Sequence, residues 1–213
     1  MSTPEQPDHR GPDGLARPWD RRRRTPPDPP EGFTEMIDAL RVLQNRITAA
    51  APPADLVGDA TKILTELATR LEPYEVPERE QLTGHLSDVP GRAQSMTPVL
   101  LIDEYDDFHV RGRVTFGRFY LGGNGAVHGG AIPLVFDEIL GRLSNTGERL
   151  PSRTAYLHVD YRSITPIEKE LQFSGEFVSE EGRKRVLRGT IRDGETLCAE
   201  AEGLFVQLRP GQP

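Results

Sequence analysis

The stretch GGNGAVHGGAIPLVFDEILG, residues 122–141, gathers the residue types that could do chemistry in this chain of 213 residues. It places six glycines and a histidine around an apolar run that carries two adjacent acids, Asp137 and Glu138. Glycines just before a buried helix let a ligand approach exposed backbone N–H groups, and the helix N-terminus adds a partial positive charge there. The pattern predicts an oxyanion site, which stabilises negative charge on a substrate oxygen.

Asp137 lies about two helical turns into the apolar run, roughly 10 Å along a helix axis. An unpaired carboxylate is expensive in apolar surroundings, which favours a functional role for this side chain. A second interpretation remains open on spacing alone. Gly129 and Gly130 could serve only as a tight turn into the helix, with His128 capping or filling it. One of the two acids would then point to solvent, because successive helical residues diverge by about 100°.

Other glycine-rich and catalytic motifs do not fit. A dinucleotide fingerprint needs GxGxxG, but His128 stands where the third glycine belongs, and no GK[ST] follows. The sequence has no GxSxG elbow and no HExxH, and a single cysteine cannot build a zinc cluster. Hydrolysis by a serine or by a helical zinc site is therefore unsupported.

The composition indicates which partners and which cellular compartment to expect. The chain has 33 acidic and 26 basic residues, a formal charge of −7, so it has no overall electrostatic reason to coat nucleic acid. Cys198 is the single cysteine and cannot form an internal disulfide. The N-terminus lacks an apolar signal segment, and no uninterrupted apolar run is long enough to span a membrane. We expect a soluble, cytoplasmic protein with neither a nucleic-acid nor a membrane partner.

The elements that position these residues can be read from periodicity and turn residues. The N-terminal stretch is rich in Pro, Asp and Arg, and two helical apolar stripes follow it, separated by Pro52-Pro53. We expect the stripes to pack on the parent domain or on a sister subunit. The predicted segments are a disordered tail at 1–31, a helical pair at 32–73, a connecting loop at 74–97, the main domain at 98–208 and a C-terminal tail at 209–213.

Within the main domain the pattern predicts two strands, one buried helix and an antiparallel meander. Alternation and turn residues place the strands at 99–102, 113–120, 154–163, 171–178, 183–192 and 196–208, and the helix at 132–143. This order is that of an α+β fold in which a sheet wraps around a helix.

The same residues resemble a known family. GNGAVHGGAIPLVFDEILG followed by RTAYLHVDYRSITP resembles the hotdog-fold acyl-CoA thioesterases, in particular the phenylacetate-pathway-like branch and related human mitochondrial thioesterase superfamily members. The likeness covers roughly residues 91–208. Its most specific elements are HGG with an acid nine positions after the histidine, and the TAxLxVxY strand. The resemblance implies a hotdog fold, an antiparallel sheet around a long central helix, assembled into homodimers or homotetramers.

The resemblance also implies roles for individual residues. Asp137 would be the catalytic carboxylate, acting as general base on water or as nucleophile. Gly129 would offer its backbone N–H to the thioester carbonyl, with His128 shaping the turn and Gly130 beside the substrate. The Thr154 hydroxyl would position water. The HGG turn and the acid would come from opposite subunits, and no metal or redox cofactor would be needed, coenzyme A being part of the substrate.

Two positions depart from the family pattern. Many relatives have Asn six residues before the histidine, where this chain has Gly122, and Asn124 is the nearest amide that could contact substrate. Strict strand alternation also puts Thr154 on the face of Tyr156 and His158, away from the side that suits packing on the helix.

Several other residues are weaker candidates for the active site. Glu138 is the competing acid and could lie near the substrate. Arg183, Lys184 and Arg185 cluster at a hairpin turn and could meet the phosphates of coenzyme A, although exposed hairpin ends are commonly basic for solubility. His158 and Asp160 could form an acid–base pair, although a solvated or interfacial sheet face is the more common reason for such a pair.

The sequence thus predicts an acyl-CoA thioesterase. The alternative is a non-catalytic acyl-CoA-binding sensor or scaffold of the same fold, whose partner docks on the N-terminal helices. A hotdog hydratase is less well supported, because the Asp-x-x-x-x-His arrangement expected of that branch is missing from the turn.

Overall fold

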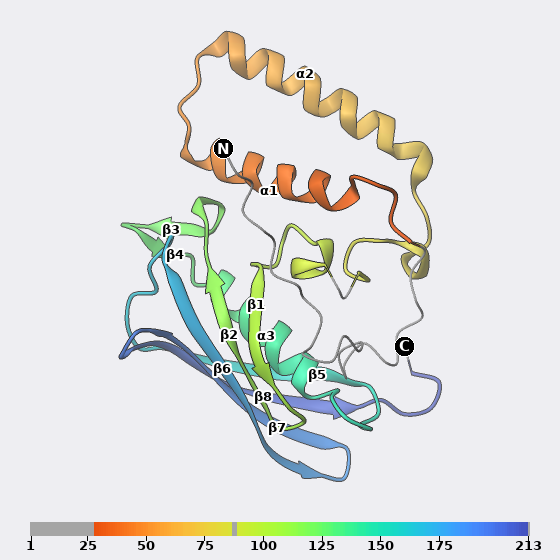
Figure 1. Cartoon of the computed structure of the whole chain (residues 1–213), viewed down its shortest axis with the longest axis vertical. Coiled ribbons are helices and arrows are strands. Elements are labelled where there is room, and N and C mark those ends of the chain that lie inside the picture. The colour runs from red at the N-terminus through yellow and green to blue at the C-terminus, as the bar shows by residue number, and fades with distance from the viewer. Residues whose placement is uncertain (1–27, 87–88, 213) are drawn as a thin grey trace.

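The computed structural model describes residues 28–86 and 89–212 (Figure 1). The predicted tail, residues 1–31, therefore lies outside the described residues except for residues 28–31. In the rest of the chain a helical pair stands at one end of the molecule, and a curved sheet holds a central helix at the other (Figure 1). This is the α+β architecture that the sequence predicts.

The sheet has six antiparallel strands in the order β1-β2-β6-β7-β8-β5. Its strands are β1 (Leu100–Tyr105), β2 (His109–Thr115), β5 (Ser152–Tyr161), β6 (Glu170–Glu181), β7 (Lys184–Asp193) and β8 (Thr196–Gln207). The last four agree with the prediction to within a few residues. Glycines with φ near +60°, Gly182 and Gly194, close the two hairpins between them.

The first two strands differ from the prediction. The acidic stretch after Ile102, which the sequence left outside any strand, extends β1 to Tyr105 and then turns tightly into β2. The Asp106 carboxylate holds this turn by accepting the backbone N–H of Phe108 and of His109, both at 2.7 Å. These bonds, with the Phe108 bond as the largest cause, lower the pKa of Asp106. The predicted strand 113–120 ends at Thr115, and residues 118–120 form the short helix η5 (Arg118–Tyr120).

The central helix α3 (Ala131–Leu143) lies against the inner face of the sheet, close to its expected bounds. Its apolar side chains, among them Val135, Phe136 and Leu140, are fully buried. The close approach depends on Gly189 in β7, where an added Cβ would lie 3.1 Å from the Phe136 ring. Asp137 is exposed on this otherwise buried helix.

The N-terminal pair consists of α1 (Phe33–Ala49) and α2 (Ala54–Leu71), joined by a short loop and followed by the short helices η2 (Glu72–Tyr74), η3 (Glu78–Glu80) and η4 (Pro90–Ala93). Ile37 of α1 is buried with Leu86 and Ala93. The Arg41 guanidinium donates to the carbonyls of Pro90 and Gln94 at 3.0 and 2.6 Å. Helix α1 is therefore attached to the domain, whereas α2 has no buried residue and lies beyond α1 (Figure 1).

None of the helices in residues 28–86 and 89–212 combines the length and apolar character needed to cross a membrane.

Candidate active site

The HGG turn joins a small hairpin to α3. The hairpin strands are β3 (Leu121–Gly123) and β4 (Ala126–Val127), and the His128 N–H donates to the Tyr120 carbonyl at 2.7 Å. The Tyr120 hydroxyl donates to the Met96 carbonyl at 3.0 Å, and burial raises the pKa of Tyr120 to about 12, so the hydroxyl keeps its proton. The turn is thus fixed at its start by a partly buried, hydrogen-bonded neighbour.

This packing explains the glycine at position 122. A Cβ on Gly122 would lie 2.7 Å from the His128 Cα, so the chain has no room there for the asparagine that the family pattern led us to expect. Asn124 lies at the exposed tip of the hairpin with a φ of 49°. Asparagine tolerates this left-handed conformation better than most residues, so turn geometry by itself accounts for Asn124.

The peptide between Gly129 and Gly130 is held on both sides. The Gly130 N–H donates to His128 Nδ1 at 3.0 Å, and the Tyr161 hydroxyl donates to the Gly129 carbonyl at 2.7 Å. Because the backbone N–H of Gly130 can only donate, His128 Nδ1 is the acceptor of this bond. We therefore assign the proton of neutral His128 to Nε2. The next residue, Ala131, donates its N–H to the His128 carbonyl at 2.8 Å.

These bonds leave one donor at the turn unused. Among the residues that the structure describes, no acceptor lies on the Gly129 N–H, and Gly129 is exposed. Gly130 is the N-cap of α3, so the free N–H lies at the positive end of the helix. The turn can therefore bind a partial negative charge, such as that on a polarised carbonyl oxygen.

Asp137 is held by Thr154, whose hydroxyl donates to Asp137 Oδ1 at 2.8 Å. Strict alternation predicted the opposite face for Thr154, and that prediction is wrong because β5 contains a bulge. Thr154 pairs with Phe205, and Tyr156 pairs with Leu204, so Ala155 is the extra residue on β5. The bulge turns Thr154 toward α3 while Tyr156 keeps the outer face.

Glu138 does not share the environment of Asp137. Its side chain is only 12% exposed and forms ion pairs with two guanidinium groups. Arg92 Nη2 donates to Glu138 Oε2 at 2.6 Å, and Arg142 Nε donates to Oε1 at 2.6 Å. Both oxygens are engaged, so Glu138 links α3 to the segment before β1, and its contact with substrate remains a prediction.

The basic hairpin divides into one buried and two exposed residues. Arg185 is 1% exposed, and its guanidinium donates to the carbonyls of Ser144 and Leu150, each at 2.8 Å. It also pairs with Glu180 at 2.8 Å. The expected phosphate contact of Arg185 is therefore corrected: this side chain joins the end of α3 to β7. Arg183 and Lys184 are exposed, and their contact with coenzyme A remains a prediction.

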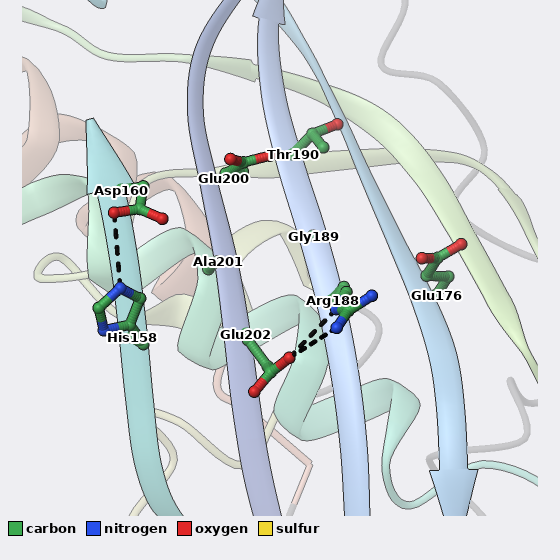
Figure 2. Close-up of a pocket in the computed structure, with 9 residues that line it drawn as sticks. All are labelled: His158, Asp160, Glu176, Arg188, Gly189, Thr190, Glu200, Ala201 and Glu202. Carbon is green, nitrogen blue, oxygen red and sulfur yellow. Dashed lines mark hydrogen bonds and ion pairs between the residues drawn. The ribbon is translucent and has the colours of Figure 1, made fainter. Parts of the chain in front are cut away.

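His158 and Asp160 lie on the outer face of the sheet, 3.5 Å apart between Nε2 and Oδ1 (Figure 2). They border a shallow hollow of about 450 Å³ that charged side chains dominate, with Arg188 paired to Glu202 at 3.0 Å. The lining contains Thr190 but no Ser or Cys, and α3 lies behind the sheet in this view (Figure 2). These charged groups pair with one another, as is common on a solvated sheet face. The hollow that they border includes neither the HGG turn nor Asp137.

Sequence reasoning missed Tyr161 and the ion pair of Arg92 with Glu138. Tyr161 is the last residue of the TAxLxVxY stretch and follows Leu157 and Val159 in the alternation that suits packing on the helix. Its side of the strand was therefore visible in the sequence, but its bond to the Gly129 carbonyl was not. Arg92 lies 46 residues from Glu138, in a segment without any periodic pattern.

Comparison with known proteins supports the resemblance. The chain is 34% identical over 96 residues to acyl-coenzyme A thioesterase THEM4 of Bos taurus, a match that covers 44% of this chain and 39% of that protein. It is 33% identical over 91 residues to THEM4 of Rattus norvegicus, covering 42% and 39%. The chain thus spans about two fifths of the length of these curated relatives. A comparison with protein-family models finds no match.

The fold agrees with a solved structure over most of the chain. The crystal structure of protein RHA08564, a thioesterase superfamily protein, superposes with a TM-score of 0.72 at 28% sequence identity. The match covers 85% of this chain and 93% of that protein, so it includes more than the sheet and its helix. The phenylacetate-pathway-like branch remains a prediction. The resemblance of this chain to thioesterase superfamily proteins of the hotdog fold is confirmed.

Proposed function

We propose that this protein hydrolyses acyl-CoA thioesters to the free acid and coenzyme A. The observation that carries the proposal is the Gly129 N–H, which is exposed at the N-terminus of α3 and has no acceptor within the described part of the chain. A thioester carbonyl bound there would be polarised, and the negative charge on its oxygen would be stabilised as the tetrahedral intermediate forms. The similarity to THEM4 supports the same chemistry.

Asp137 supplies the second requirement, a carboxylate for attack. As general base it takes a proton from water, whose oxygen bonds to the carbonyl carbon, and the C–S bond then breaks as the thiolate of coenzyme A leaves and accepts a proton. As nucleophile it forms an anhydride that water hydrolyses in a second step. In both routes the Thr154 bond at 2.8 Å holds Oδ1 in one orientation.

The two parts of the site belong to different subunits in this proposal. Asp137 is seven residues beyond Gly130 on α3, about 10 Å along the axis, which is too far for both groups to act on one carbonyl. Strand β5, which carries Thr154 and Tyr161, forms an edge of the sheet and is open to pairing. We propose a homodimer, or a tetramer built from such dimers, in which Asp137 faces the partner subunit's Gly129.

The reaction as written draws on water and protein groups alone, so it needs no metal or redox cofactor. Arg183 and Lys184 could contact the phosphates of coenzyme A, and a cytoplasmic location suits the composition.

The alternative is a sensor or scaffold that binds acyl-CoA without turnover, and the exposed N-terminal helices favour it as a docking platform. One experiment separates the two functions. Calorimetric binding and thiol release would be measured on the full chain with short, medium, long and aromatic acyl-CoAs. Thiol release from at least one thioester supports the hydrolase. Binding of acyl-CoA without thiol release from any thioester would contradict the hydrolase and support the sensor.

A further inference from the structure

Helices α1 and α2 each carry apolar side chains that the fold leaves exposed, and together these form what we call the stripe. On α1 it consists of Met36, Leu40, Leu43 and Ile47, between 36 and 57% exposed. On α2 it consists of Leu56, Val57, Ile63, Leu64, Leu67 and Leu71, between 40 and 65% exposed. In proteins most of the stability of a helix comes from packing its apolar face rather than from helix propensity. Helix α2 has no buried residue, so its stripe needs a partner.

We propose that this stripe binds the same stripe of a second copy of this chain, with the two α2 helices antiparallel and the four helices forming a bundle. This assembly is separate from the pairing proposed for β5 and does not depend on the catalytic activity.

The spacing of the α2 stripe is self-complementary. Five of its large residues and the partly buried Ala60, with Val57 outside the series, recur at intervals of 4, 3, 1, 3 and 4 residues, which read the same from either end: Leu56, Ala60, Ile63, Leu64, Leu67 and Leu71. A two-fold interface requires each contact to occur twice with the roles exchanged. In an antiparallel pair centred between Ile63 and Leu64, Ala60 lies opposite Leu67, so a small residue faces a large one. This alternation lets the two helices interdigitate.

The exposed area matches what a stable interface needs. Burying a large aliphatic side chain is worth about 1.5–3 kcal/mol at about 25 cal/mol per Å², which corresponds to roughly 60–120 Å² for each fully exposed residue. At the exposures given above, the ten large side chains offer on the order of 450 Å² of apolar surface on each copy. A standard interface buries about 800 Å² per partner, of which about 60% is apolar, or about 480 Å².

The charges favour a second copy over other occupants. On α2, Asp55 and Asp59 lie near the N-terminus and Arg70 in the last turn, so antiparallel copies bring opposite charges together and oppose their helix dipoles. A membrane-binding helix would carry a basic polar face, whereas the polar residues of α2 include three acids and two bases. The sequence before α1 offers few apolar groups to bind the stripe, because residues 1–27 contain only Met1, Leu15 and Trp19 as large apolar residues.

The first test is the molar mass of the full chain in solution, measured by light scattering during gel filtration. The variant Ile63→Glu/Leu67→Glu places two charges in the stripe, and its matched control Thr61→Glu/Thr65→Glu places two charges on the polar side of α2. We expect the stripe variant to have half the mass of the wild type and the control to keep it. A stripe variant with the wild-type mass overturns the proposal. Circular dichroism confirms that both variants are folded.

The second test does not depend on the stripe variant folding well. Ile63 is 65% exposed and would lie near the two-fold axis, so oxidation of Ile63→Cys should give a covalent dimer on a non-reducing gel. Thr61→Cys should not, and the buried Cys198 of the wild type serves as the blank. Equal cross-linking at positions 61 and 63, or none at 63, overturns the proposal. Neither readout uses turnover, so failure here is distinct from failure of the proposed hydrolysis.

Discussion

Replacing Thr154 by valine should slow thioester hydrolysis about tenfold. Valine keeps the volume and branching of threonine but removes the hydroxyl that donates to Asp137 Oδ1 at 2.8 Å. A hydrogen bond to a charged group contributes about 1.5–3 kcal/mol, and we take the lower value because both side chains are exposed before substrate binds. About 1.4 kcal/mol corresponds to a factor of ten in rate.

The assay is steady-state thiol release at fixed pH with the thioester that the wild type hydrolyses best. Because Thr154 acts through Asp137 on the chemical step, the loss should fall on kcat and leave KM nearly unchanged. Thr154→Ser restores the hydroxyl and should stay within about threefold of the wild type. A valine variant with wild-type kcat would refute the inference that Thr154 positions Asp137.

Three further predictions concern the same site. Tyr161→Phe removes the bond to the Gly129 carbonyl at 2.7 Å, and should lower kcat/KM about two- to tenfold without changing the melting temperature by more than a few degrees; an unchanged kcat/KM would contradict it. Glu138→Gln weakens two ion pairs of a side chain that is 12% exposed, and should cost about 1–3 kcal/mol in urea unfolding, whereas Glu104→Gln at an exposed pair should cost less than about 0.5 kcal/mol; equal costs would contradict it. Mixed and co-refolded Asp137→Asn and Gly129→Pro chains should regain about a quarter of the wild-type activity, because half of the dimers then hold one intact site, and no regain would argue against a site shared between subunits.

The strand pattern and the central helix were predictable from the sequence because the relevant signals are local. Gly182 and Gly194 mark hairpin turns that the structure confirms, and the apolar run from Ile132 forms the buried helix α3. The length of strand β1 was underestimated because its second half is acidic and partly exposed. Pairing with β2, rather than local propensity, keeps this half extended.

The side-chain geometry of the site depended on features without a local signal. A bulge at Ala155 decides which face Thr154 occupies, and period-two reasoning assumes that no such bulge exists. Glu138 and Arg185 carry charges that suggest exposure, yet their partners lie far away in the sequence: Arg92 is 46 residues from Glu138, and the Ser144 carbonyl is 41 from Arg185. Long-range partners of this kind cannot be read from the order of residue types.

The most direct test of the proposed function compares thiol release by the wild type and Asp137→Asn in parallel preparations, with acyl-CoA binding measured on both. Asparagine keeps the shape of the side chain but can act neither as base nor as nucleophile, and general base catalysis alone contributes about 10²–10⁴ in rate. We predict that kcat falls by at least about a hundredfold while acyl-CoA still binds. A folded Asp137→Asn variant that releases thiol at the wild-type rate would contradict the assignment of Asp137 as the catalytic carboxylate.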